Sequence, residues 1–179
     1  MEIRLRKLEE KDAEFMYEWM TDPEIFSFFR FDASSVTLQT CREYILHAYD
    51  DLNSIHYAIV NEKDEYLGTV SLKNITEKDA EYAISTRKKV HGTGVAYKAT
   101  MEILQIAFEE LHLQEVYLNV LGDNTRAISF YKKVGFQVYD HDENTVNIKG
   151  MDKCLEWYHC SYKLYAQFWK SRYVKGFTE

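Results

Sequence analysis

Two glycines separated by one residue, Gly92 and Gly94, lie in a basic segment of a chain whose net charge is −7. No Asp or Glu occurs among the twenty residues between Glu81 and Glu102, where the composition of the chain predicts about 3. Helix starts normally attract carboxylates, because their N–H groups and the helix dipole present positive charge. A helix start that lacks carboxylates suits an anionic ligand, so we predict that phosphate oxygens bind there and supply the missing charge. The segment has a net charge of +4, from Arg87, Lys88, Lys89 and Lys98.

A second segment, from Asn124 to Gly135, has the spacing of a capped helix. Asn124 is a good N-cap, and Gly135 suits the left-handed position that follows a helix. The apolar face of this helix consists of Ala127, Ile128, Phe130, Tyr131 and Val134. Each of these residues has a sufficient structural role, so their spacing alone assigns no function to the segment.

Several familiar ligand motifs do not fit the sequence. The dinucleotide pattern GxGxxG fails because its third glycine position is Tyr97, and no P-loop sequence GxxxxGK[ST] occurs. The acidic run at 140–145 lacks the glycine and the final glutamate of a calcium loop, and we interpret it as a hairpin tip. The histidines show no paired metal-binding spacing, so we predict no metal.

Taken together, the two segments resemble the acyl-CoA signature of the GNAT superfamily of N-acetyltransferases. The residues that match the family pattern are Gly94, Ala96, Asn124, Ala127, Tyr131, Gly135 and Phe136. His91 departs from the pattern, because the family has Arg or Gln at this position. Residues 5–24 resemble the opening strand and helix of the branch that includes ribosomal-protein, polyamine and amino-sugar acetyltransferases. The similarity extends from residue 2 to about residue 160.

This resemblance implies that the chain uses acetyl-CoA. The missing anion is then the pyrophosphate of coenzyme A, and the pantetheine arm pairs with the preceding strand through Ile84 and Thr86. By the same resemblance Asn124 steadies that arm. The main-chain N–H groups that hold the pyrophosphate come from His91, Gly92, Thr93, Gly94, Val95 and Ala96.

The resemblance also implies direct attack of a neutral amine on the thioester. Tyr131 matches the tyrosine that protonates the departing thiolate, and a backbone N–H near Ile84 stabilises the oxyanion. Glu81 lies where some members of the family keep a catalytic glutamate. A solvent-facing role for Glu81 is about as probable, and a chain of water molecules could replace the base.

The acceptor is the least determined part of the prediction. We expect a primary amine of a small molecule, an amino sugar or a polyamine. The alternatives are a protein N-terminus as acceptor, or a non-catalytic module that binds acyl-CoA and a partner protein. Outside the basic segment the net charge is −11, which favours cationic partners and disfavours nucleic acid. Four phenylalanines in the loop that lines the acceptor pocket in this family could contact the acceptor or pack in the core: Phe26, Phe28, Phe29 and Phe31.

Length and composition predict a single domain, residues 1–179, that contains these sites. Its C-terminal part, from about residue 161, is an aromatic extension. The chain has 46% hydrophobic residues and no apolar run long enough to span a membrane, so we expect a cytoplasmic protein. Its three cysteines form no CxxC pair and are expected to be reduced. A homodimer is compatible with these features.

The expected fold is α/β, with a mixed and mostly antiparallel sheet of the GNAT type, helices on its faces and a splayed central strand pair. Asp12 should cap the first helix, and Pro23 should close that segment. Alternating residues predict strands near 3–5, 55–74 around a turn at 61–65, 80–86, 115–120, 136–141 and 154–162. Helical spacing predicts helices after Asp12, at 36–51, from Gly94 onward, at 124–135 and at 162–174.

Overall fold

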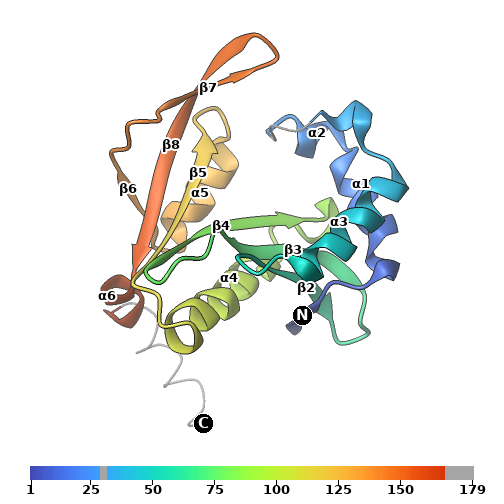
Figure 1. The fold of residues 1–179 in the computed structure, drawn as a ribbon, viewed down its shortest axis with the longest axis horizontal. Coiled ribbons are helices and arrows are strands. Elements are labelled where there is room, and N and C mark those ends of the chain that lie inside the picture. The colour runs from blue at the N-terminus through green and yellow to red at the C-terminus, as the bar shows by residue number, and fades with distance from the viewer. Residues whose placement is uncertain (29–31, 168–179) are drawn as a thin grey trace. The chain divides into compact units, whose positions relative to one another are not determined.

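The computed structural model of the chain describes residues 1–28 and 32–167 (Figure 1). Contacts divide the chain into two compact units. The first unit consists of Met1–Ile75 and Tyr82–Ile103, and the second of Thr76–Glu81 and Leu104–Glu179. The organisation of the chain as one domain stays a prediction.

The strands follow the order β1-β2-β3-β4-β5-β8-β6, and β7 pairs with β8. The pairing of β4 with β5 is parallel, whereas β1 with β2, β2 with β3, and β8 with each of β5, β6 and β7 are antiparallel. The sheet is therefore mixed and mostly antiparallel, as the sequence predicted. The strands are β1 (Ile3–Lys7), β2 (Ile55–Asn61), β3 (Tyr66–Lys73), β4 (Asp79–Thr86), β5 (Glu115–Leu121), β6 (Gln137–Tyr139), β7 (Thr145–Ile148) and β8 (Met151–Ser161).

The first unit builds its core between β2 and helices of the N-terminal half. Ala58 and Val60 of β2 pack in one buried cluster with Met16 of α1 and Ile45 of α3. Ile59 between them is also fully buried, so both faces of β2 are covered. The helices of this unit are α1 (Ala13–Met20), α2 (Pro23–Phe26), α3 (Leu38–Asp50) and the start of α4 (Val95–Gln105), with short 3₁₀ turns at Glu10–Asp12, Ala33–Ser35 and Lys88–Val90.

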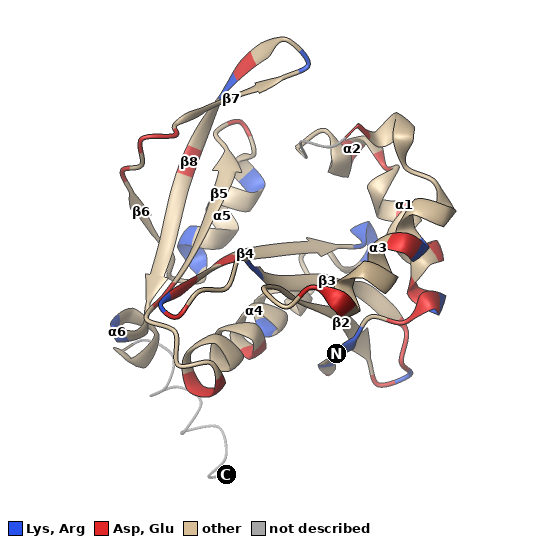
Figure 2. Ribbon diagram, viewed as in Figure 1, with Lys and Arg blue, Asp and Glu red and all other residues tan. Residues whose placement is uncertain are grey.

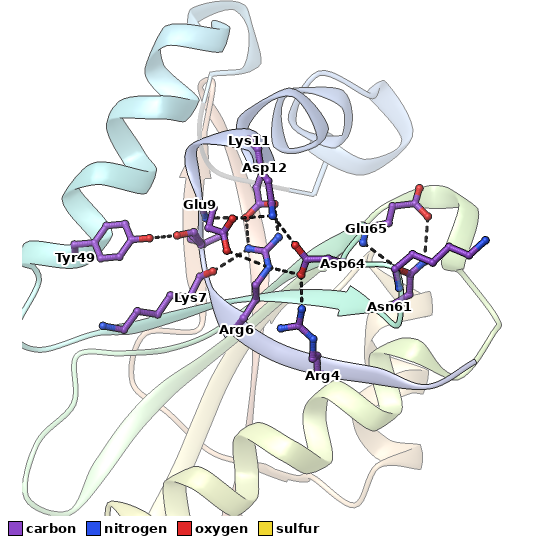
Figure 3. Close-up of polar contacts among 12 residues, drawn as sticks. Arg4, Arg6, Lys7, Glu9, Lys11, Asp12, Tyr49, Asn61, Asp64 and Glu65 are labelled. Carbon is purple, nitrogen blue, oxygen red and sulfur yellow. Dashed lines mark hydrogen bonds and ion pairs between the residues drawn. The ribbon is translucent and has the colours of Figure 1, made fainter.

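One of two local expectations for the first unit is wrong. Asp12 precedes α1 but makes no side-chain cap to that helix. Its carboxylate instead accepts hydrogen bonds from the Arg6 guanidinium, at 2.8 Å to each oxygen, and Figure 3 shows this pair beside Asp64. The expected end of the first helical segment before Pro23 is confirmed, because α1 ends at Met20. Pro23 also begins the short helix α2, where its missing N–H costs nothing in the first helical turn.

The second unit packs α5 and the C-terminal turns against β5 and β8. The alternate residues Val116 and Leu118 of β5, and Tyr158 and Cys160 of β8, are almost completely buried. Its helical elements are a π-helical turn (Ile106–Glu110), α5 (Thr125–Lys133) and α6 (Tyr162–Tyr165). The predicted C-terminal helix is confirmed only for this last short turn, because the positions from 168 onward lie outside the described residues.

The segment between β6 and β8 also differs from the expectation. It contains the additional strand β7, whose hairpin with β8 turns at Lys149 and Gly150, both with positive φ. The Asn147 side-chain oxygen accepts the Gly150 N–H at 3.0 Å and so provides the turn chemistry. The acidic run at 140–145 therefore links β6 to β7 and does not form the hairpin tip.

Three further expectations concern the cysteines, membrane-spanning helices and metal ligands. All three cysteines are free, and Cys41 and Cys160 are buried. Within residues 1–28 and 32–167, no helix is long and apolar enough to cross a membrane. In the same part of the chain, no group of three or more His, Cys, Asp or Glu residues is placed to hold a metal ion.

Candidate functional site

The basic glycine segment forms a loop between β4 and α4 in the first unit. The Arg87 N–H donates to the Leu67 carbonyl of β3 at 2.8 Å, which fixes the point where β4 ends. The His91 ring nitrogen Nε2 lies 3.2 Å from the Thr86 carbonyl and donates a hydrogen bond to it. The residue that departs from the family pattern thus ties the loop back to its own strand.

Both glycines of the loop adopt backbone conformations that favour glycine. The φ angles of Gly92 and Gly94 are +77° and +85°, and no atom of residues 1–28 or 32–167 would lie within 4 Å of a Cβ atom at either position. The packing of the chain therefore does not require small residues here, but the backbone conformation does. The Lys98 N–H donates to the Gly94 carbonyl at 3.1 Å, so the amides of Val95 and Ala96 precede the hydrogen-bonded part of α4. A glycine turn followed by a helix start fits a phosphate group.

Two buried contacts hold the elements on either side of this loop. The Tyr82 hydroxyl of β4 and the Thr100 hydroxyl of α4 lie 2.7 Å apart, and both residues are buried. Gly68 of β3 brings β3 so close to β4 that a Cβ atom there would lie 2.3 Å from the Ser85 carbonyl oxygen. Ile84 and Thr86, the residues predicted to pair with the cofactor, are half-buried on the same strand.

The structure corrects the idea that only a ligand could balance the charge of this loop. Arg87 is buried, and its guanidinium binds the Glu18 carboxylate of α1 through two contacts of 3.0 and 2.6 Å. It also lies 4.4 Å from the centre of the Phe15 ring. Lys88 pairs with Glu24 of α2 at 2.6 Å, and Lys89 pairs with Glu65. Carboxylates from distant parts of the sequence therefore compensate three of the basic residues.

The second motif lies in the second unit and has the predicted helical structure. The Asn124 side chain accepts the Ala127 N–H at 3.2 Å and caps α5. Gly135 follows the helix with a φ of +95°, as predicted for a left-handed terminating residue. These local predictions are confirmed, and the contact of Asn124 with a cofactor stays a prediction.

Tyr131 lies on the buried face of α5 among other aromatic rings. Its ring centre lies 6.0 Å from that of Phe136 and 6.4 Å from that of Tyr158. The side chain is 9% exposed, and burial raises the pKa of its hydroxyl to about 12. The phenol therefore keeps its proton throughout the neutral pH range.

Glu81 lies at the end of the short parallel ladder between β4 and β5. This ladder joins Asp79–Glu81 to Glu115–Tyr117, so Glu81 pairs with Tyr117. Burial first, and then the charges of Glu81 and Asp79, raise the pKa of Tyr117. Glu81 is half-buried, and it contributes negative charge to this part of the sheet.

The predicted site residues fall into two groups, one in each unit. Ile84, Thr86 and the loop 91–96 belong to the first unit, whereas Glu81, Asn124 and Tyr131 belong to the second. Of the expected acceptor phenylalanines, Phe26 is half-buried and Phe28 is 37% exposed. Phe29 and Phe31 lie outside the described residues.

The sequence missed Arg87 as the residue that ties the loop to α1. Its acidic partner Glu18 lies 69 residues earlier in the chain. The sequence around Arg87 contains only basic residues and therefore does not predict an acidic partner so far away in the chain. The one available signal is an arginine directly after a buried strand, which is weak, because arginines at strand ends are usually exposed.

Comparisons with known proteins extend this description. A family model described as an acetyltransferase (GNAT) domain matches residues 2–137. The acetyltransferase PseH of Campylobacter jejuni is 24% identical over 142 residues, which cover 79% of this chain and 87% of the relative. The spermidine N(1)-acetyltransferase of Escherichia coli K12 is 26% identical over 138 residues, 76% of this chain and 73% of the relative.

Solved structures agree with the fold. The spermidine N-acetyltransferase from Vibrio cholerae in complex with CoA and spermine superposes with a TM-score of 0.81 and 22% identity, over 92% of this chain and 98% of the other. A probable acetyltransferase superposes with a TM-score of 0.78 and 26% identity, over 90% and 93% of the two chains.

Proposed function

Because the chain belongs to the GNAT acetyltransferase family, whose domain model spans residues 2–137, we propose that it acetylates a primary amine of a small molecule. Membership of this family makes the chain an acetyl-CoA-dependent N-acetyltransferase and confirms the resemblance predicted from the sequence. The small-molecule acceptor is the new element of the proposal. A homodimer, a cytoplasmic location and the lack of a nucleic-acid partner stay predictions.

The observation that carries the cofactor part of the proposal is the glycine turn before α4. Its backbone conformation is one that few residues other than glycine adopt, and no packing contact among the described residues explains it. The N–H groups of this loop and of the first turn of α4 would hold the pyrophosphate of acetyl-CoA. They are contributed by His91, Gly92, Thr93, Gly94, Val95 and Ala96. Along β4, the backbone of Ile84 and Thr86 would orient the pantetheine arm, with Asn124 as a further contact.

Acetyl-CoA supplies the thioester, and the side chains of the protein supply the proton chemistry. Tyr131 would donate its phenolic hydrogen to the departing sulfur, as its match to the family tyrosine suggests. With a pKa of about 12, this phenol is a weaker acid than an alkyl thiol, whose pKa is about 8.5. Hydrogen-bond donation to the developing negative charge would therefore contribute more than complete proton transfer. The N–H of Ile84 would stabilise the charge on the thioester oxygen.

Glu81 is the proposed base, with a chain of water molecules as the alternative. The Glu81 carboxylate and its neighbour Asp79 both add negative charge around Tyr117. Negative charge on the sheet attracts a cationic amine, and a carboxylate near the amine can accept the proton that the amine must lose before attack.

The class of acceptor is inferred from the relatives together with this negative charge. One relative is a spermidine N(1)-acetyltransferase, and one structural neighbour was solved with spermine. A polyamine or an amino sugar carries a protonated primary amine that carboxylates can attract. We therefore place small amines before protein N-termini as acceptors.

The test is thiol release from acetyl-CoA across a panel of amines. The panel contains spermidine, spermine, an amino sugar and a short peptide with a free N-terminus. We expect turnover with at least one small amine, and a kcat/KM for the peptide at least about tenfold lower.

Two results would contradict the proposal. A higher kcat/KM with the peptide than with every small amine would assign the protein acceptor instead. Calorimetric binding of acetyl-CoA without turnover on any amine would favour the non-catalytic binding module.

A further inference from the structure

The two faces of the sheet in the second unit differ in burial. Leu118 of β5 and Tyr158 of β8 lie on one face, where each is at most 1% exposed, and the Tyr131 ring of α5 lies against Tyr158. Alternate residues of a strand point to the opposite face. There the aromatic side chains are only half-buried: Tyr117, Tyr139 and His159. Packing against α5 therefore explains the aromatic residues of the first face but not those of the second.

The strand register brings four aromatic residues of the second face together. β8 lies between β5 and β6 (Figure 1), so its residues have a neighbour on either side. Tyr117 of β5 pairs with His159 of β8, and Tyr139 of β6 pairs with Trp157 of β8. The ring centres of Tyr117 and Tyr139 each lie 6.2 Å from that of Trp157. We call Tyr117, Tyr139, Trp157 and His159 the aromatic face.

Trp157 is the fixed centre of the aromatic face. It is 8% exposed, and its Nε1 donates to the Glu143 carbonyl at 2.5 Å. The His141 ring stacks on it, with ring centres 3.7 Å apart. An indole held in this way supports its neighbours and leaves little surface for a ligand. Tyr117 and Tyr139, on the flanking strands, are the rings that a ligand can reach.

Three carboxylates flank the aromatic face. Glu81 pairs with Tyr117 across the ladder between β4 and β5, and Asp79 pairs with Glu115 at the start of the same ladder. None of the paired strand positions on this face holds Lys or Arg. Burial first, and then the charges of Glu115, Tyr117 and Asp79, raise the pKa of Tyr139 to about 12, so the carboxylates also influence β6. Aromatic rings and carboxylates together attract ammonium groups.

We propose that the aromatic face binds a second, non-reacting ammonium group of the acceptor, so that the acceptor is a diamine or a polyamine. The inference rests on the proposed function, because Glu81, the proposed base, lies at the edge of this face beside Tyr117. The reacting amine is held near Glu81, and the methylene chain packs along the rings. The distal ammonium lies over a tyrosine ring, where the charges of Asp79 and Glu115 add to the attraction.

The test compares amines that differ only in the distal charge. Diaminobutane is compared with pentylamine, and diaminooctane with nonylamine, because in each second compound a methyl group replaces the second ammonium. We expect kcat/KM to be at least about tenfold higher for the diamine in one of the two pairs. The difference should lie mainly in KM, because the distal contact is the same in the ground state and in the transition state.

Substitutions then assign this preference to the aromatic face. Tyr139→Leu removes a ring and should lower the preference for the diamine by about three- to tenfold, whereas Tyr139→Phe keeps the ring and should keep the preference. Glu115 lies 3.3 Å from the Nδ1 atom of His159, and Glu115→Gln removes its charge at nearly constant shape. It should lower the preference by about two- to fivefold at low salt. A purely structural role would change both amines of a pair equally.

The matched control for charge is Glu10→Gln. Glu10 is an exposed carboxylate that pairs with Arg42 at 3.6 Å, and its loss changes the net charge by the same amount as the loss of Glu115. Glu10→Gln should leave the preference for the diamine unchanged. The calorimetric affinity for coenzyme A should be the same in all of these variants, which shows that each of them is folded.

Turnover with an amino sugar alone, or equal kcat/KM values within both amine pairs, would overturn this inference and leave the proposed function intact. So would an unchanged preference in a folded Tyr139→Leu variant, or an equal loss in Glu10→Gln. If Tyr139→Leu changes the oligomeric mass measured by light scattering and not the preference, a second copy of the chain occupies the face and the inference is wrong. No turnover with any amine, amino sugars included, would overturn the proposed function and this inference with it.

Discussion

The loop between β4 and α4 and the helix α5 each contain one half of the family pattern, but the structure explains them differently. In α5, Asn124 caps the helix, Tyr131 packs among aromatic rings and Gly135 terminates the helix. In the loop, Gly92 and Gly94 adopt positive φ angles where no atom of the described residues requires a small side chain. Folding thus accounts for the conspicuous residues in α5. In the loop it accounts for the basic residues and His91, but no packing contact of the described residues explains the positive φ of the two glycines.

This difference shows where function can be separated from structure. In the loop, the unexplained feature is the backbone itself, and a change there should affect ligand binding more than stability. In α5, the ring of Tyr131 packs among other aromatic rings, whereas the proposed chemical role belongs to its hydroxyl. A substitution that removes only the hydroxyl therefore separates the two roles.

The largest effect is expected from Tyr131→Phe, which keeps the buried ring and deletes the hydroxyl. If the phenol donates its hydrogen to the departing sulfur, single-turnover acetyl transfer at saturating acetyl-CoA should slow by about 10²- to 10⁴-fold. The affinity for acetyl-CoA should stay nearly unchanged. Equal single-turnover rates for variant and wild type would make Tyr131 a packing residue only and leave protonation of the sulfur to water.

The next largest effect is expected from Gly94→Asp, which places a negative charge where we propose that the pyrophosphate approaches the backbone. Coenzyme A should bind about 100-fold more weakly or worse in calorimetry, because charge repulsion adds to the strain at a φ of +85°. Gly94→Asn is the matched control, since it has nearly the same shape and no charge. Equal losses in both variants would attribute the effect to the backbone, and no loss in either would remove the loop from the cofactor site.

Local sequence signals predicted most elements of both regions correctly. The cap at Asn124 and the glycine at 135 set the two ends of α5, and both signals act within a few residues. Contacts across long separations in the sequence could not be predicted. The pair of Arg87 with Glu18 and the buried contact between Tyr82 and Thr100 depend on how the elements pack, which no local pattern specifies.

The difference between local signals and tertiary contacts also explains the expectations that were wrong. Asp12 has the residue type and position of a helix cap, but the neighbouring Arg6 binds its carboxylate instead (Figure 3). Similarly, the basic loop seemed to lack acids because its carboxylates come from elsewhere in the chain, including Glu24 in α2. Figure 2 shows acidic residues (red) beside α2. Tertiary contacts thus decided where these charges are balanced.

A smaller effect is expected at Asn124, where a structural cap and a predicted cofactor contact coincide. Asn124→Ala should lower the free energy of unfolding by about 1 kcal/mol, because the Ala127 N–H loses its acceptor. Asn124→Ser keeps a capping oxygen but removes the amide, and it should restore most of this stability. If the amide also contacts the pantetheine arm, Asn124→Ser should still bind coenzyme A several-fold more weakly in calorimetry. Affinity restored together with stability would leave Asn124 with the structural role alone.

The smallest effect is the contribution of the buried Tyr131 hydroxyl to the pH dependence of folding stability. This contribution is measurable only at alkaline pH. An unfolded phenol titrates near 10, whereas that of Tyr131 titrates at about 12 in the folded chain. Between these values the folded state binds more protons than the unfolded state, so stability falls as the pH rises from 10 toward 12. Tyr44, Tyr139 and Tyr158 also have pKa values of about 12, so Tyr131 contributes only part of the loss, about 2 kcal/mol at most by pH 12.

Thermal unfolding of the wild type and of Tyr131→Phe at pH 8 and pH 11 isolates the part of the alkaline loss of stability that is due to Tyr131. The melting temperature of the wild type should fall further between the two values than that of Tyr131→Phe, by a few degrees. Tyr44→Phe is the matched control for another hydroxyl with a raised pKa, far from α5 in the sequence, and it should show a difference of the same sign. An identical decrease for Tyr131→Phe and wild type would mean that water reaches this hydroxyl in the folded state. The phenol would then be a stronger acid than its burial indicates, and complete proton transfer to the sulfur would be less unfavourable than a pKa of about 12 implies.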